Sequence, residues 1–260
     1  MQKENENIPI ILTAFGTTAK AFATYEKMDQ VFQQTFPKHL IHWAYSSKMV
    51  KQTMKQKQNL NLKDPLEISQ NLADQGHKWV VMQSLHLICG KEFHRLVAEQ
   101  VQVNIRSSIG LPLLTSHKDY EKTAIALAQN FPKEKDSAIV LVGHGTDHPA
   151  WTAYTALEAV LRKQYGDSIF VGVLEKFPDM NYTLERVKRA GFAKVCLIPL
   201  LLVAGVHFNK DLTVEQNSWK KTFERNNIEV SIVDHGIGEL GAVTKIFCDH
   251  IADALDVIPL

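Results

Sequence analysis

The stretch that decides the fold is Ala138-Ile-Val-Leu-Val-Gly-His-Gly-Thr146, an apolar, β-branched run that ends in Gly-His-Gly. An altered copy, Ile10-Ile-Leu-Thr-Ala-Phe-Gly-Thr17, stands near the start of the chain. In this copy Phe15 takes the place of His144, at an offset of 129 residues. Short β-branched runs that end at a glycine are typical of buried parallel strands. Two such copies indicate that one structural unit occurs twice.

A second pair of segments extends the repeat at an offset of 115 residues. The first is Val80-Val-Met-Gln-Ser-Leu-His-Leu-Ile-Cys-Gly90, and the second is Val195-Cys-Leu-Ile-Pro-Leu-Leu-Leu-Val-Ala-Gly205. Two residues beyond the closing glycines lie Glu92 in one half and His207 in the other. The offset of 129 also sets Ser46 opposite Glu175.

Only the second half therefore places histidine, glutamate and histidine after successive strands, at His144, Glu175 and His207. Two imidazoles and one carboxylate suit a borderline divalent metal such as Co²⁺, Ni²⁺, Fe²⁺ or Zn²⁺. Three protein ligands also leave coordination positions open, as a catalytic or transfer site requires. The asymmetry predicts one metal-handling site in a duplicated scaffold. Taken singly, each histidine is better explained as a hydrogen-bonded or exposed polar residue, and the joint placement of the three residues is what favours a metal site.

Short apolar runs alternate with longer amphipathic stretches along the whole chain, which predicts an α/β fold. We expect two similar doubly wound lobes with parallel sheets, related by a pseudo-twofold axis. The polar segment 131–136 is the expected boundary, which gives an N-terminal lobe at 1–130 and a C-terminal lobe at 131–260. The C-terminal lobe carries the metal site, and the last amphipathic stretch, 242–254, is expected to pack back on the first lobe. Because strand-end loops share one edge of such sheets, the site is expected in the cleft between the lobes.

The expected elements follow the same order in both halves. The expected strands are 8–15, 41–45, 79–85, 111–115, 138–143, 168–174, 194–202 and 228–233. The expected helices include 64–76, 116–130, 149–165, 179–190 and 210–225. Asp64, Pro65 and Glu67 are typical of a helix start, and Gly76 is typical of a position just past a helix end.

The composition excludes several classes of protein. With 45% hydrophobic and 22% charged residues and a net charge of +1, the chain has no overall field to attract nucleic acid or an anionic membrane. No segment approaches the roughly 20 apolar residues of a transmembrane helix, and the polar N-terminus does not resemble a secretion signal. Cys89, Cys196 and Cys248 form no close-spaced pair, so a reducing cytoplasm is the expected location.

Four local features leave alternatives open. Gly143 and Gly145 either let a flat ligand approach the backbone or serve the strand-to-helix turn alone. Glu175 is either a metal ligand or a helix-capping carboxylate, and His148 either lines the same pocket or opens the next helix. His86 follows an apolar run, and a ligand-lining role and a buried structural role are both compatible with it.

The ordered set of motifs resembles the anaerobic sirohydrochlorin cobaltochelatases, a branch of the class II chelatases that also includes ferrochelatases. The resemblance covers nearly the whole chain. It rests on Thr13–Thr17, Gln83–Glu92, Leu113–His117, Val142–Gly145, Glu175 with Pro178, Pro199–His207 and Asn217–Lys220.

The resemblance implies that His144, Glu175 and His207 bind cobalt and that His144 accepts a proton. His144 and Glu175 are thus the expected catalytic residues. Many relatives read Gly-Asp-His before the last histidine, whereas this chain reads Gly205-Val206-His207, which changes the charge near the metal. Some relatives are exported and bind haem, a role that we do not expect without a signal peptide.

The expected function is insertion of Co²⁺ into sirohydrochlorin, in the anaerobic route to cobalamin. The metal is a substrate and no organic cofactor is expected. Residues expected to hold the ring are Phe15, Leu85, His86, Leu202, Val203, Ala204 and Gly205. Candidates for the ring carboxylates are Lys48, Lys91, Arg95 and Lys210. Insertion of Fe²⁺ or Ni²⁺ into the same or a related ring is the alternative within enzymes, and a two-lobed metal- or tetrapyrrole-binding protein without catalysis is the alternative outside them. The expected partner is the tetrapyrrole, and neither nucleic acid nor a membrane is expected to bind. A homo-oligomer is compatible with the sequence.

Overall fold

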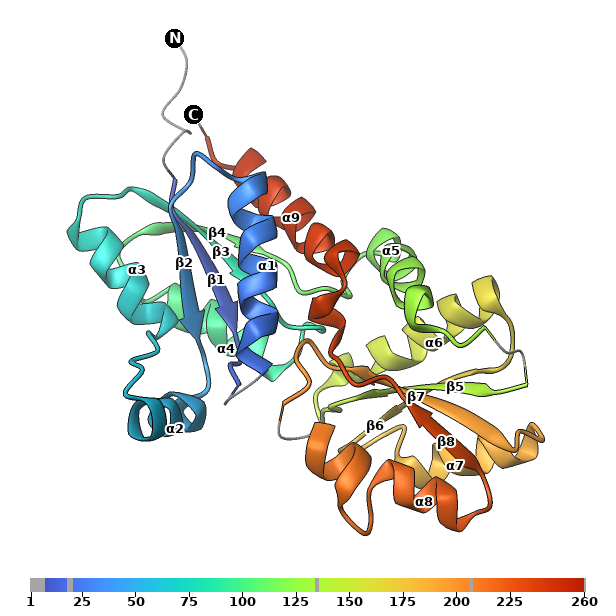
Figure 1. Cartoon of the computed structure of the whole chain (residues 1–260). Helices are drawn as coiled ribbons and strands as arrows, with labels where there is room; N and C mark the ends of the chain where they lie inside the picture. Colours follow the sequence, from blue (N-terminus) through green and yellow to red (C-terminus); the bar gives the residue numbers. More distant parts are fainter. Residues whose placement is uncertain (1–7, 18–20, 134–135, 206–207, 260) are drawn as a thin grey trace. The chain divides into compact units, whose positions relative to one another are not determined.

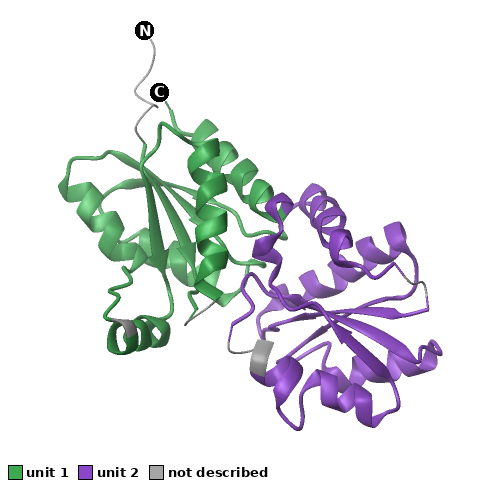
Figure 2. Ribbon diagram, in the orientation of Figure 1, with its two compact units in different colours: residues 1–115, 243–260 green, residues 116–242 purple. Residues whose placement is uncertain are grey.

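The computed structural model describes residues 8–17, 21–133, 136–205 and 208–259, which form two compact units (Figure 2). One unit comprises residues 1–115 and 243–260, and the other comprises residues 116–242. In the described part of the chain, each unit contains a four-stranded parallel sheet with helices on both faces (Figure 1). The expected α/β class with parallel sheets is confirmed.

The two sheets have the same topology. The first has the order β2 (Ile41–Tyr45), β1 (Ile10–Ala14), β3 (Trp79–Ser84) and β4 (Arg106–Gly110). The second has the order β6 (Ile169–Val173), β5 (Ala138–Gly143), β7 (Lys194–Leu200) and β8 (Glu229–Ile232). The strand that comes first in each half therefore lies second in its sheet.

The register of the strands reproduces the sequence offsets. Ile10 of β1 pairs with Val81 of β3, and Ile139 of β5 pairs with Cys196 of β7. These pairs differ by the offsets of 129 and 115 residues that relate the two halves of the sequence. The duplication predicted from the sequence is present in the hydrogen-bond register.

In the first unit, each face of the sheet is covered by two helices. The helices α3 (Pro65–Asp74) and α4 (Lys91–Gln100) enclose a core that includes Ile68, Leu72 and Leu96. The helix α1 (Phe22–Thr35) covers the other face, where Tyr25 and Phe32 pack on Trp43. The helix α9 (Gly241–Asp256) lies beside α1 (Figure 1), and the thiol of Cys248 lies 3.7 Å from the hydroxyl of Thr35.

In the second unit, α7 (Met180–Arg189) and α8 (Trp219–Arg225) cover one face of the sheet. Trp219 and Phe223 of α8 and Leu184 and Val187 of α7 fill the core there. The helix α6 (Thr152–Tyr165) packs on β6, with α5 (His117–Leu127) beside it. None of the described helices has the length and apolar character needed to cross a membrane.

The last helix of each half belongs to the other unit. The helix α5 follows β4 but groups with the second unit, whereas α9 follows β8 and groups with the first (Figure 2). A hydrogen bond of 2.8 Å between His250 of α9 and the carbonyl oxygen of Leu111 ties α9 to the first unit. The N-terminal segment of the first unit thus ends at Thr115, whereas the boundary expected from the sequence is at residue 130.

The expected fourth strand at 111–115 is wrong, because the strand is the more polar segment Arg106–Gly110. Residues 113 and 114 are apolar for a different reason: Leu113 and Leu114 are buried beneath the loop that follows β3. Their amide groups donate to the carbonyl oxygens of His86 and Leu87, at 2.9 and 2.8 Å. Burial of a loop therefore produced a strand-like pattern.

The expected helix at 210–225 is two elements, a π-helix (Phe208–Val214) and α8. Ser218 separates them, because its hydroxyl accepts a hydrogen bond from the amide of Lys221 and starts α8. The helix α2 (Lys48–Gln58) was not expected and begins at the capping residue Ser47.

Two helix starts are confirmed. Asp64 accepts from the amide of Leu66 at the start of α3, and Ser116 forms a capping box with Asp119 at the start of α5. Gly76, just past α3, has the positive φ of 87° that favours glycine.

Candidate functional site

His144 lies in a turn directly after β5, between two glycines that have different neighbours. A Cβ atom on Gly143 would lie 2.5 Å from the ring of Tyr154. A Cβ atom on Gly145 would lie 1.8 Å from the carbonyl oxygen of Glu175, and Gly145 also has a φ of +91°. The space beside both glycines is thus filled by protein atoms. Packing and backbone conformation account for these glycines without a ligand.

The turn of His144 is bonded directly to the segment of Glu175. The amide of Glu175 donates to the carbonyl oxygen of His144 at 2.9 Å, and the amide of Leu174 donates to that of Gly143 at 2.9 Å. These bonds continue the pairing of β5 and β6 beyond the ends of the strands. The side chains of His144 and Glu175 are both exposed. The structure therefore brings the first two predicted ligands together at adjacent backbone positions.

Glu175 does not cap the next helix. The N-cap of α7 is Asp179, whose carboxylate accepts from the amide of Tyr182 at 2.8 Å. His148, by contrast, does open a helix, because its Nδ1 accepts from the amide of Ala150 at the start of the short helix Pro149–Trp151.

The equivalent turn in the first unit corrects one pairing made from the sequence. There the amide of Ser46 donates to Ala14 at 2.9 Å, and the amide of Ser47 donates to Phe15 at 3.1 Å. The structural counterpart of Glu175 is therefore Ser47 rather than Ser46. The reason is that the connection between the first two strands is one residue longer in the first half, as the registers Ile10 to Ile41 and Ile139 to Ile169 show. Phe15 remains the counterpart of His144.

The third predicted ligand, His207, lies outside the described residues. Within the described ranges, no three histidine, cysteine, aspartate or glutamate side chains are grouped so that they could hold a metal. The apolar loop before it is anchored at Leu201 and Leu202, whose carbonyl oxygens accept from the amides of Ile237 and Gly238 at 2.9 Å each.

The residues expected to hold the ring differ in exposure. In the second unit, Leu202 is buried, whereas Val203, Ala204 and Gly205 are partly exposed. In the first unit, Phe15 is 42% exposed and Leu85 only 2%. Leu85 therefore packs in the interior of its unit, while Phe15 presents its aromatic ring at the end of β1.

His86 is partly exposed as a residue, but one nitrogen of its imidazole ring is buried. Its Nδ1 lies 2.8 Å from the hydroxyl of Ser84, and its buried Nε2 has no hydrogen-bond partner among the described residues. Burial, followed by the positive charge of Arg95, lowers the pKa of His86 to about 4. The imidazole is therefore neutral at physiological pH, and the unpartnered nitrogen is the polar atom that remains to be satisfied.

Of the basic candidates, Arg95 has the best-defined position. Its Nη2 donates to a carboxylate oxygen of Glu92 at 2.6 Å and to the carbonyl oxygen of Ser46 at 3.3 Å. These contacts hold the guanidinium at the carboxyl edge of the first sheet. Lys48, Lys91 and Lys210 are exposed.

A residue that the sequence interpretation missed is Tyr154 of α6. Its hydroxyl oxygen accepts a hydrogen bond from the amide of Gly145 at 3.2 Å, and its side chain is 3% exposed. Burial raises the pKa of Tyr154, which is therefore protonated at neutral pH. The sequence did contain a signal for Tyr154, because the first half has a tyrosine, Tyr25, at the equivalent position 129 residues earlier.

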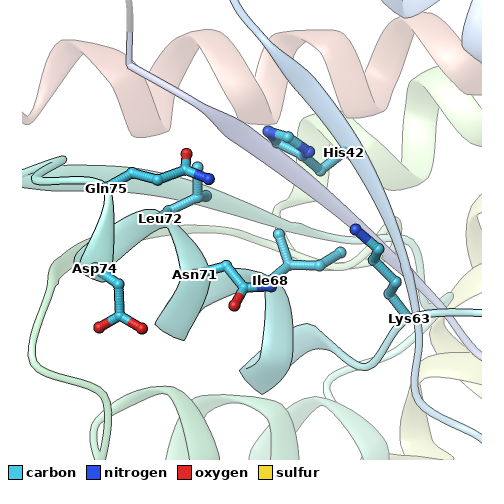
Figure 3. Close-up of a pocket in the computed structure, with 7 residues that line it drawn as sticks. All are labelled: His42, Lys63, Ile68, Asn71, Leu72, Asp74 and Gln75. Carbon is cyan, nitrogen blue, oxygen red and sulfur yellow. The ribbon is translucent and has the colours of Figure 1, made fainter.

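A pocket of about 300 Å³ lies in the first unit, away from these residues (Figure 3). It is lined by His42, Lys63, Ile68, Asn71, Leu72, Asp74 and Gln75. His42 stands near the start of β2, whereas the predicted site residues follow the carboxyl ends of strands. The pocket contains none of the predicted site residues.

The fold is that of the class II chelatases. The structure of the sirohydrochlorin chelatase SirB from Bacillus subtilis subspecies spizizenii, in complex with cobalt, matches with a TM-score of 0.65 at 15% identity, over 96% of this chain and 95% of that one. The structure of CbiX, the terminal enzyme for siroheme biosynthesis in denitrifying bacteria, matches with a TM-score of 0.57 at 12% identity, over 95% of this chain and 99% of that one.

Sequence comparison gives the family. The cobalt chelatase (CbiK) family model matches residues 9–256, so the chain belongs to this family. The sirohydrochlorin cobaltochelatase of Salmonella typhimurium is 33% identical over 82% of this chain and 83% of its own. The sirohydrochlorin cobaltochelatase CbiKC of Nitratidesulfovibrio vulgaris is 28% identical over 96% of this chain and 91% of its own.

Proposed function

We propose that this protein is a sirohydrochlorin cobaltochelatase, which inserts Co²⁺ into the ring for cobalamin synthesis. Family membership and the relatives from Salmonella and Nitratidesulfovibrio support this reaction. The structural observation that carries the proposal is the turn that joins His144 to Glu175 by a backbone hydrogen bond of 2.9 Å. This turn sets an imidazole and a carboxylate at neighbouring exposed positions, a donor pair that suits Co²⁺.

In the proposed reaction, His144, Glu175 and His207 hold the metal while it loses water and enters the ring. Two pyrrole N–H protons must leave during insertion. His144 is the proposed acceptor of one of them once the metal has passed to the ring and freed the lone pair of its imidazole, and the other proton passes to solvent. Glu175 supplies the negative charge that offsets part of the charge of the cation. The protein thus contributes chiefly an open metal site and the positioning of the ring.

The residues expected at the ring differ in exposure, and we propose different roles for them on that basis. Phe15, Val203, Ala204 and Gly205 offer exposed or partly exposed atoms to its flat face. Leu85 and Leu202 are buried, as is the Nε2 atom of His86, and we propose that these three residues support the loops that meet the ring. The ring carboxylates need cationic donors, for which Arg95 is the best-positioned candidate, followed by Lys48, Lys91 and Lys210.

We place the reaction in the cytoplasm, since Cys89, Cys196 and Cys248 are all free in the structure.

The test is insertion by the purified protein of Co²⁺, Fe²⁺ or Ni²⁺ into sirohydrochlorin, followed by the absorbance of the metallated ring. The proposal predicts that the protein accelerates Co²⁺ insertion well above the rate without protein. Faster Fe²⁺ or Ni²⁺ insertion would reassign the metal. Tight ring binding without acceleration for any metal would identify a non-catalytic binding protein and contradict the proposal.

A further inference from the structure

We propose that Tyr154 is a positioning residue for His144, which fixes the turn so that the imidazole is held beside Glu175. This inference rests on the proposed metal site. Tyr154 does not touch the metal or the ring in this account. It acts through the backbone on both sides of His144.

Tyr154 contacts each glycine that flanks His144. Its ring fills the space beside Gly143, where a Cβ atom would lie 2.5 Å from Cε1 of the tyrosine. Its hydroxyl oxygen accepts the amide hydrogen of Gly145 at 3.2 Å. Because the side chain is 3% exposed, water does not readily replace this acceptor.

The same turn is fixed to Glu175 from its other side. The carbonyl oxygen of His144 accepts from the amide of Glu175, and Gly145 packs against the carbonyl oxygen of Glu175. The peptide group between His144 and Gly145 is therefore held at both ends, by Tyr154 at its N–H and by Glu175 at its C=O. Loss of the tyrosine hydroxyl would release the N–H and leave the bond to the C=O intact, which allows the imidazole to move relative to the carboxylate.

The first unit contains the same tyrosine without the histidine. Tyr25 is 2% exposed, and its hydroxyl forms a hydrogen bond with the backbone of Gly16, whose φ is +99°. The turn it supports carries Phe15 in place of His144. The chain thus supplies an internal control, in which the tyrosine-glycine bond is kept and the proposed ligand is missing.

The variants Tyr154→Phe and Tyr25→Phe each keep the ring and remove only the hydroxyl. Both should lower the stability of the fold to a similar extent. Supporting contacts around a metal ligand typically change metal affinity by 10- to 100-fold, so Tyr154→Phe should raise the Kd for Co²⁺ by about tenfold. Tyr25→Phe should leave this Kd unchanged. In the presence of saturating Co²⁺, Tyr154→Phe should recover most of the insertion rate, because the proton acceptor is retained.

The experiment is titration of the full chain with Co²⁺ in the absence of the ring, and the visible absorption bands of the bound ion report binding. The titration is carried out on both tyrosine variants, on His144→Ala, and on the double variant that combines Tyr154→Phe with His144→Ala. The inference predicts weaker binding in Tyr154→Phe and no further weakening when it is added to His144→Ala. Unchanged Co²⁺ affinity in Tyr154→Phe, or equal weakening in Tyr25→Phe, would overturn the inference while the proposed function stands. Unchanged affinity in His144→Ala would overturn the metal assignment, and with it the role of Tyr154.

Discussion

Replacement of Gly145 by alanine should damage the candidate site more than the same change at its counterpart, Gly16. The two glycines have similar φ angles of +91° and +99°. An alanine in this region costs about 1–2 kcal/mol. The contacts differ, because the new Cβ atom would lie 1.8 Å from the backbone oxygen of Glu175 but 3.1 Å from a side-chain methyl group of Val50. A side chain can move aside, whereas the backbone of Glu175 is held by its bond to His144.

Overpacking of this kind costs about 1–3 kcal/mol in addition. We therefore expect Gly145→Ala to lower the free energy of unfolding by about 2–5 kcal/mol, and Gly16→Ala by about 1–2 kcal/mol. Urea denaturation gives both values. Titration of the folded variants with Co²⁺ should show a large loss of affinity for Gly145→Ala and none for Gly16→Ala. Equal destabilisation together with unchanged Co²⁺ binding would refute the claim that the Gly145 contact positions Glu175.

Two further predictions concern the charges of the site. Glu175→Gln should raise the Co²⁺ concentration needed for insertion, and high Co²⁺ should partly restore its rate. His144→Ala should remain slow at saturating Co²⁺ because it lacks the proton acceptor. Full recovery of the His144→Ala rate would mean that another group or water accepts the proton. His86 has its pKa lowered from 6.5 to about 4, so the unfolded chain binds this proton first. Its contribution to stability, at most roughly 3 kcal/mol, is present above pH 6.5 and is lost as the pH falls toward 4. Urea midpoints should therefore fall less steeply between pH 6.5 and 4.5 in His86→Gln, and an unchanged slope would contradict the buried neutral imidazole.

The sequence was sufficient to predict the strands that carry the candidate site. β1, β5 and β6 are short, buried along their whole length and mostly apolar, so their repeat can be recognised without a structure. The offset of 129 between Phe15 and His144 is kept in the structure because Phe15 directly follows β1 and His144 directly follows β5, the equivalent strand of the second sheet. The offset changes by one residue before the second strand, because the longer first connection shifts the counterpart of Glu175 to Ser47.

Other features depend on contacts that no local pattern contains. The edge strand β4 is partly exposed, so its sequence lacks the apolar run that a central strand shows. Leu113 and Leu114 form part of an apolar run outside any strand, because they are buried under a loop. Tyr154 was missed because its role depends on the distance from its hydroxyl to a backbone amide nine residues earlier in the chain. Comparison of the two halves could have identified it, since Tyr25 repeats it.

The most direct test of the central claim is the position of Co²⁺ in a crystal soaked with the ion and recorded at the cobalt absorption edge. The account predicts one cobalt ion in the second unit, about 2.0–2.2 Å from an imidazole nitrogen of His144 and a carboxylate oxygen of Glu175, with His207 as the third protein ligand. Cobalt bound elsewhere, with His144 and Glu175 turned away from each other, would contradict it.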